Sequence, residues 1–125
     1  MVKIKAAVCH KFGAPLQIET INLREPLTGE VEVTLGAVAV CHSDISFAAG
    51  DWGGELPAVY GHEAAGFVSK TGNAVKGFEI GDRVVVTLIK SCGSCNNCLE
   101  GNPTICEANN LAMPPILSAE NKTIQ

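Results

Sequence analysis

The sequence lacks a basic cluster and a long apolar run, and both absences narrow the possible functions. Nine Lys and Arg residues stand against thirteen Asp and Glu residues, for a net charge of −4, so nothing favours the phosphate backbone of a nucleic acid. The longest apolar runs, such as Ala37 to Cys41, are far shorter than the roughly 20 residues of a membrane span. Lys3, Lys5 and Lys11 interrupt the apolar N-terminus, whereas a secretion signal contains an uninterrupted apolar stretch. We therefore expect a soluble, cytoplasmic protein with no nucleic acid or membrane partner.

A Gly-x-Gly-x-x-Gly dinucleotide fingerprint, an internal repeat and a low-complexity tract are also missing from the 125 residues. A chain of this length has room for one domain with one hydrophobic core. Five segments have strand character, separated by turns rich in Gly, Asn, Asp and Pro: Val2 to Cys9, Leu16 to Thr20, Glu30 to Val40, Ala64 to Lys70 and Arg83 to Ile89. We therefore expect a mainly β fold.

Within Glu30 to Val40, residues alternate between apolar and polar: Val31, Val33 and Leu35 against Glu30, Glu32 and Thr34. This period of two predicts a half-buried antiparallel sheet. One helix is expected after Cys41, with Ser43 or Asp44 as its cap and Gly50 at its end.

Four of the six cysteines follow the pattern Cys92-x2-Cys95-x2-Cys98-x7-Cys106. Four thiolates in a glycine- and asparagine-rich loop favour a closed tetrahedral zinc site, which stabilises a loop but has no open position for a reactant. Two alternatives remain. Paired disulfides suit an extracellular chain better. An iron–sulfur cluster fits the first three cysteines, but the fourth has the wrong spacing and is followed by Glu107 in place of proline.

Cys41 and His62 are a second pair of possible metal ligands, since one follows a predicted strand and the other precedes one. Taken alone, each is more often an ordinary core or polar residue. Asp44 strengthens the metal hypothesis, because a carboxylate that accepts the second ring N–H of a histidine ligand fixes the orientation of that ring. Asp44 can also be a helix cap.

Together, the run from Cys41 to Val68, the sequence Gly81-Asp82-Arg83-Val84 and the four cysteines resemble the zinc-containing alcohol dehydrogenases of the medium-chain dehydrogenase/reductase superfamily. The resemblance extends to about Cys106. It implies a GroES-like, partly open β-barrel with a zinc-binding lobe at about residues 90–110, and a separate Rossmann domain for NAD or NADP that these residues do not include. Residues 1–125 would then be an incomplete catalytic domain, inactive alone, of an enzyme that is a homo-oligomer in its complete form.

The resemblance also implies roles for individual residues. Cys41 and His62 become ligands of a catalytic zinc, Glu63 lies beside that metal, and Asp44 is the partner of His62. Ser43 receives the proton of the alcohol substrate, whereas Ser46 stands where many relatives have a relay histidine. His42 would contact the cofactor pyrophosphate, and Trp52 and Leu88 would line the substrate pocket, although His42 can equally be an exposed loop residue and the other two plain core.

The implied reaction converts an alcohol to an aldehyde or ketone, with hydride transfer to NAD or NADP. Because the third protein ligand of the family's catalytic zinc is not among these residues, we expect the four-cysteine zinc to be held well and the catalytic zinc weakly or not at all. The alternative is a stand-alone zinc-binding GroES-like module without redox activity. The missing fingerprint favours the module, while Cys41 and His62 favour the enzyme.

Overall fold

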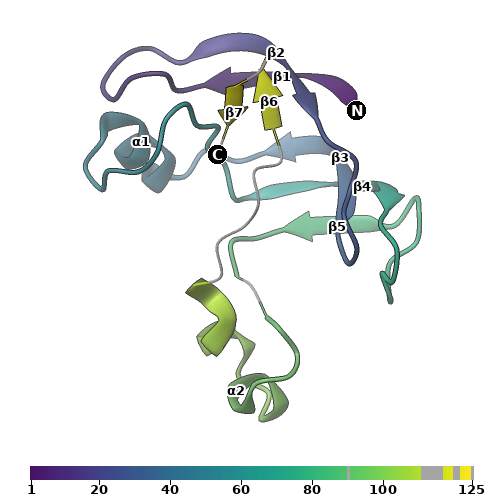
Figure 1. Cartoon of the computed structure of the whole chain (residues 1–125). Coiled ribbons are helices and arrows are strands. Elements are labelled where there is room, and N and C mark those ends of the chain that lie inside the picture. The colour runs from purple at the N-terminus through teal and green to yellow at the C-terminus, as the bar shows by residue number, and fades with distance from the viewer. Residues whose placement is uncertain (90, 111–116, 120–121, 125) are drawn as a thin grey trace.

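Two antiparallel sheets form most of the structure (Figure 1). The structure is a computed structural model that describes residues 1–89, 91–110, 117–119 and 122–124. The first sheet has the strand order β1-β2-β6-β7 and contains β1 (Val2–Val8), β2 (Gln17–Leu23), β6 (Leu117–Ala119) and β7 (Lys122–Ile124). The second has the order β3-β4-β5 and contains β3 (Val31–Val38), β4 (Ala64–Thr71) and β5 (Arg83–Val86). The predicted mainly β fold is confirmed.

Short helical segments connect and extend the sheets. They are α1 (His42–Ala49), α2 (Asn96–Leu99) and the 3-10 turns η1 (Pro103–Ile105) and η2 (Glu107–Asn110). Figure 1 shows that α2 and its neighbours form a lobe that projects away from both sheets. In the described part of the chain, no helix has the length and apolar character needed to cross a bilayer.

The hydrophobic core lies on one face of β1 and β2. Ile4, Ala6 and Val8 of β1 point inward, while Lys3 and Lys5 are exposed. Across the register, Ile4 pairs with Ile21 of β2. Val8 and Ile21 are almost completely buried, and Val59 packs against them. The period of two in β1 therefore places one row of apolar side chains in the core.

The predicted burial pattern of β3 is wrong, although the predicted antiparallel sheet is confirmed, since β3 pairs with β4. Val31 and Val33 are half-buried, but so is Glu32, and Leu35 is 53% exposed. The register shifts between Glu32 and Val33 and again between Leu35 and Ala37. Each irregularity of this kind changes which side chains share a face, so a strict alternation in the sequence does not become a strict alternation in burial.

The ends of the elements also differ from the sequence prediction. The strand expected to end at Thr20 continues to Leu23, and the strand expected to reach Ile89 ends at Val86. The helix is confirmed. Neither Ser43 nor Asp44 is its N-cap residue, but Asp44 does satisfy a free backbone N–H at its start, as expected.

The N-cap residue of α1 is Cys41, and Asp44 is the third helical residue. The Asp44 carboxylate accepts a hydrogen bond from the Cys41 N–H at 2.9 Å. This contact satisfies a backbone donor that would otherwise lack a partner at the start of the helix. At the other end, Gly50 stops the helix in a left-handed conformation with φ of 91°, as the sequence predicts.

The backbones of β3 and β4 lie so close at Gly66 that a substitution there tests the register of the two strands. An added Cβ at Gly66 would lie 2.1 Å from the Thr34 carbonyl oxygen, whereas one at Gly36 would have only an ordinary contact at 3.6 Å. Gly66→Ala should therefore lower the free energy of unfolding by about 2 kcal/mol or more, since the backbone must move. Gly36→Ala, the matched control, should have a much smaller effect. Urea unfolding of both variants measures the difference, and equal losses would contradict the register of β3 with β4.

Candidate metal centres

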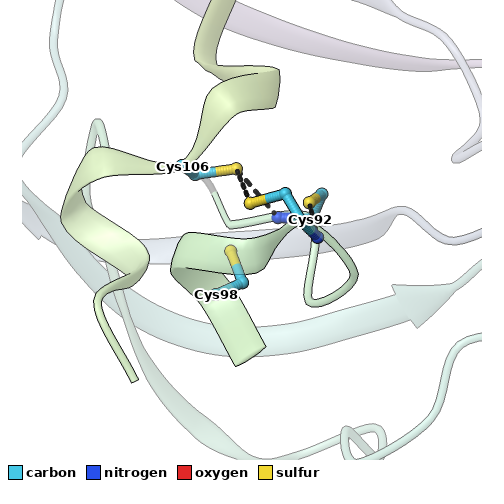
Figure 2. Close-up of side chains that lie close together, drawn as sticks. Cys92, Cys98 and Cys106 are labelled. Atoms are coloured by element: carbon cyan, nitrogen blue, oxygen red, sulfur yellow. Dashed lines mark hydrogen bonds between the residues drawn. The ribbon is translucent and has the colours of Figure 1, made fainter. Parts of the chain in front are cut away.

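The four cysteines of the lobe come together in the structure. Cys92 precedes α2, Cys95 is its N-cap residue, Cys98 lies within it and Cys106 follows η1. Their four sulfur atoms all lie within 4.8 Å of one another, and the Sγ atoms of Cys95 and Cys106 are 4.0 Å apart. Figure 2 shows the labelled Cys92, Cys98 and Cys106 gathered in one place. All four carry free thiols.

This arrangement suits a zinc ion. Zinc–thiolate bonds of about 2.3 Å in a tetrahedron place the sulfurs about 3.8 Å apart, close to the separations in the lobe. Backbone N–H groups already point at the sulfurs: Cys92 Sγ accepts from the N–H of Cys95 at 3.3 Å, and Cys106 Sγ accepts from the N–H of Cys92 at 3.3 Å. Such donors favour the charged thiolate, which is the form that binds a metal.

The four thiols differ in acidity. Hydrogen bonds from the Ser94 hydroxyl, the Ser94 N–H and the Cys95 N–H lower the pKa of Cys92 from 9.0 to about 6. The backbone N–H of Gly93 lowers the pKa of Cys98, but burial and the neighbouring thiols outweigh it and raise that pKa to about 11. The lobe without metal therefore holds at least one thiolate and one thiol at neutral pH.

A second group of donors lies between α1 and β4. One ligand atom each from Cys41, His62 and Glu63 lies within 4.8 Å of the others. Cys41 is at the start of α1, and the other two immediately precede β4. A sulfur, an imidazole nitrogen and a carboxylate oxygen form a mixed donor set that suits zinc and leaves a tetrahedral position open. The two predicted ligands are therefore neighbours in the structure, with Glu63 beside them.

Asp44 connects the two halves of this group. Besides its contact with the Cys41 N–H, its carboxylate lies 3.4 Å from His62 Nδ1. Glu63 lies 3.5 Å from the other ring nitrogen, His62 Nε2. A carboxylate on Nδ1 orients the ring and directs Nε2 toward the remaining donors. Asp44, the predicted partner of His62, thus lies beside its ring.

The remaining candidate residues have different surroundings. The Ser43 hydroxyl oxygen is buried and has no hydrogen-bond partner among the described residues. Ser46 is buried within α1, whereas His42 is exposed. Trp52 is 60% exposed and Leu88 is 64% exposed. Neither of these last two is a core residue, so the plain-core interpretation is wrong for both.

An open, mainly apolar hollow of about 390 Å³ lies next to the second donor group. His62 and Glu63 contribute to its wall, and the rest comes from small or apolar side chains of β3, β4 and β5 and their ends: Ala37, Ala39, Ala64, Ala65, Val85, Val86 and Thr87. Trp52 and Leu88 do not line this hollow. The structure therefore brings the metal-ligand candidates to a cavity but leaves both predicted pocket residues outside it.

Phe47 and Tyr60, which no motif in the sequence marks as functional residues, lie on the two segments that carry the second donor group. The two rings stack with centroids 5.6 Å apart, and Phe47 also makes an edge-to-face contact with Trp52 at 4.8 Å. Phe47 and Trp52 are five residues apart, but Tyr60 comes from a separate loop. No local pattern in the sequence indicates such a stack.

The family comparison and the protein comparison both match alcohol dehydrogenases. Residues 28–119 match the alcohol dehydrogenase GroES-like domain. An alcohol dehydrogenase from Moraxella sp. (strain TAE123) is 42% identical over 108 residues, which are 84% of this chain and 32% of that protein. The chain thus spans about a third of the length of this relative.

Solved structures of alcohol dehydrogenases are also similar to this chain. An alcohol dehydrogenase zinc-binding domain protein from Burkholderia ambifaria superposes with a TM-score of 0.80 and 38% identity, over 86% of this chain and 29% of that one. An NAD-dependent alcohol dehydrogenase superposes with a TM-score of 0.73 and 35% identity, over 83% of this chain and 32% of that one.

The different acidities of the lobe thiols predict different reactivities in the metal-free chain. Iodoacetamide should alkylate Cys92 already near pH 6, because its lowered pKa makes it a thiolate there. Cys98 should react only at much higher pH. Mass spectrometry after brief labelling across the pH range measures both. Ser94→Ala removes one donor and should shift the Cys92 profile to higher pH, and parallel alkylation of both cysteines would contradict the prediction.

Proposed function

The chain belongs to the alcohol dehydrogenase GroES-like domain family, and from this premise we propose that it forms the metal-binding part of an enzyme that oxidises alcohols. The products would be aldehydes or ketones, and NAD or NADP would accept the hydride. The convergence of Cys41, His62 and Glu63 beside an apolar hollow is the observation that carries the proposal. An NAD-dependent alcohol dehydrogenase among the similar structures supports the choice of cofactor.

Cys41 and His62 would hold a catalytic zinc, with Glu63 beside it. When bound, zinc would supply Lewis acidity that makes an alcohol hydroxyl more acidic. Asp44 would keep His62 in the tautomer that carries its proton on Nδ1, which leaves Nε2 free as a ligand atom. The apolar wall formed by Ala64, Val85 and their neighbours would receive the carbon skeleton of the substrate.

Ser43 would relay the proton that the alcohol loses: its hydroxyl oxygen would accept that proton while its own hydroxyl proton passes on. Its hydroxyl oxygen is buried beside this group and has no other hydrogen-bond partner among the described residues, so it is free to accept one from a substrate. From Ser43 the proton must reach solvent, and Ser46 is a serine where relatives have a histidine. Since a serine hydroxyl does not hold a proton near neutral pH as imidazole does, water would carry the proton onward.

The four cysteines would hold a second, structural zinc that has no open position for substrate. In this proposal residues 1–125 are an incomplete catalytic domain, with the zinc lobe at about residues 90–110. The cytoplasm is the matching compartment, because free thiolate ligands persist in a reducing environment. His42, which is exposed beside Cys41, would contact the cofactor pyrophosphate.

Metal analysis tests the lobe. The anaerobically purified chain should retain about one zinc per molecule after dialysis, since four thiolates bind zinc far more tightly than an open site. Cys98→Ser should lose this zinc and destabilise the lobe, whereas Cys41→Ser, the matched control, should keep it. A colourless preparation supports zinc. A brown one, or zinc retained equally by both variants, contradicts the assignment.

Turnover tests the catalytic proposal in a chimera. Residues 1–125 would replace the matching segment of the Moraxella alcohol dehydrogenase, to which they are 42% identical. The chimera should reduce NAD or NADP in the presence of an alcohol, and Cys41→Ser should abolish this activity. Ser43→Ala should lower kcat by about 100-fold, a usual loss for a positioned proton acceptor.

Ser91→Ala, a change at an exposed serine, is the control for the Ser43 variant and should leave kcat unchanged. A chimera that folds and holds zinc but does not oxidise alcohols would overturn the dehydrogenase proposal in favour of a zinc-binding module without redox activity. Full activity of Ser43→Ala would remove Ser43 from the mechanism and leave the rest intact.

A further inference from the structure

The stacked aromatic rings of Phe47 and Tyr60 connect the two segments that carry the second donor group. Phe47 lies on α1, whose N-cap is Cys41, and Tyr60 lies two residues before His62. Their rings are nearly parallel, at 15° with centroids 5.6 Å apart. Both side chains are half-buried. The contact between these two rings therefore links the segment of Cys41 to the segment of His62.

The backbone next to His62 does not by itself fix the position of this residue. Gly61, between Tyr60 and His62, has φ of 133°, a region open to glycine but rarely to other residues. Glycine restrains the following residue little, so the position of His62 depends on contacts to either side. On the far side, the Glu63 carbonyl accepts a hydrogen bond from the Ala39 N–H at 2.8 Å. On the near side, the next anchored side chain is Tyr60.

Tyr60 is itself anchored to the first sheet. Two residues before it, Ala58 forms a pair of backbone hydrogen bonds with Cys9 at 2.8 and 3.0 Å. Burial and the adjacent Cys9 thiol raise the pKa of the Tyr60 hydroxyl, so the phenol is neutral and packs as an uncharged ring. The path of contact thus leads from the end of β1 through Tyr60 to Phe47 on α1.

Trp52 is the last member of this cluster. Its ring meets the Phe47 ring edge to face, with centroids 4.8 Å apart and planes at 88°, a favoured arrangement of aromatic pairs. Trp52 is otherwise largely exposed. Its orientation therefore depends on Phe47.

We propose that Phe47 and Tyr60 are positioning residues, which hold Cys41 and His62 at the separation that a shared metal ion requires and orient Trp52 beside them. The inference rests on the proposed function, since it concerns the same donor group. It adds two residues that touch neither metal nor substrate. Their effect is on the affinity of the open metal site and leaves the four-cysteine lobe unchanged.

Cobalt binding to the chimera described above, with zinc already in the lobe, tests this role, because residues 1–125 alone are expected to hold the open-site metal weakly or not at all. Co²⁺ at the open site should give a thiolate-to-cobalt absorption band that Cys41→Ser lacks. Tyr60→Leu removes the stack and should weaken Co²⁺ binding by about three- to tenfold, the equivalent of one aromatic pair. Tyr60→Phe keeps the ring and should restore affinity to within about twofold of the original. Asp44 is a direct partner of His62, so Asp44→Asn should lower the Co²⁺ affinity about 10- to 100-fold.

Two measurements separate positioning from general damage. The zinc content of the lobe should stay the same in all Tyr60 and Phe47 variants. In the 125-residue chain, whose only tryptophan is Trp52, Phe47→Leu should change the fluorescence emission. Phe47→Leu decides the question if Tyr60→Leu does not fold, and it should weaken Co²⁺ binding to a similar extent. Unchanged Co²⁺ affinity in a folded variant overturns the positioning role and leaves the metal site intact. Absence of the Cys41-dependent band in the unmodified chimera overturns both the positioning role and the open metal site.

Discussion

The Asp44 carboxylate contacts two segments of the chain at once. It accepts a hydrogen bond from the Cys41 N–H at 2.9 Å and lies 3.4 Å from His62 Nδ1. The first contact starts α1 at Cys41, and the second orients the ring that precedes β4. A half-buried carboxylate is costly unless polar partners surround it, and here its partners are the two residues that the proposed catalytic metal needs. The start of the helix and the geometry of the donor group therefore depend on the same side chain.

The four-cysteine lobe is stabilised in a different way from the sheets. In the described residues 91–108 only Cys106 is buried, whereas Leu99 and Ile105 are largely exposed. Apolar burial, which holds Val8 and Ile21 together in the first sheet, is thus almost absent from the lobe. A segment of this kind gains its stability from metal–ligand bonds. On the proposed function, the closed set of four thiolates is a folding element, and the mixed, open set at Cys41 and His62 is a reactive one.

Several features could be read from the sequence because they are local. The strand character of Val2 to Cys9, the glycine that ends α1 and the close spacing of the four cysteines each act within a few residues. The bulges in β3 could not be read, because they depend on the register with β4, and so Leu35 is exposed where alternation predicts burial. The stack of Tyr60 on Phe47 likewise depends on a contact between separate segments.

The hollow beside His62 and Glu63 limits what these residues can do on their own. It is open and shallow, and its wall is built from small side chains such as Ala37 and Ala64. Small side chains leave room for a substrate beside the donor group, but they do not exclude water from it. Hydride transfer proceeds best in a site that is closed to solvent. The proposed reaction therefore needs a second wall opposite β3, β4 and β5, and the exposed apolar side chains of Phe67 and Val85 on the same strands offer a surface for it.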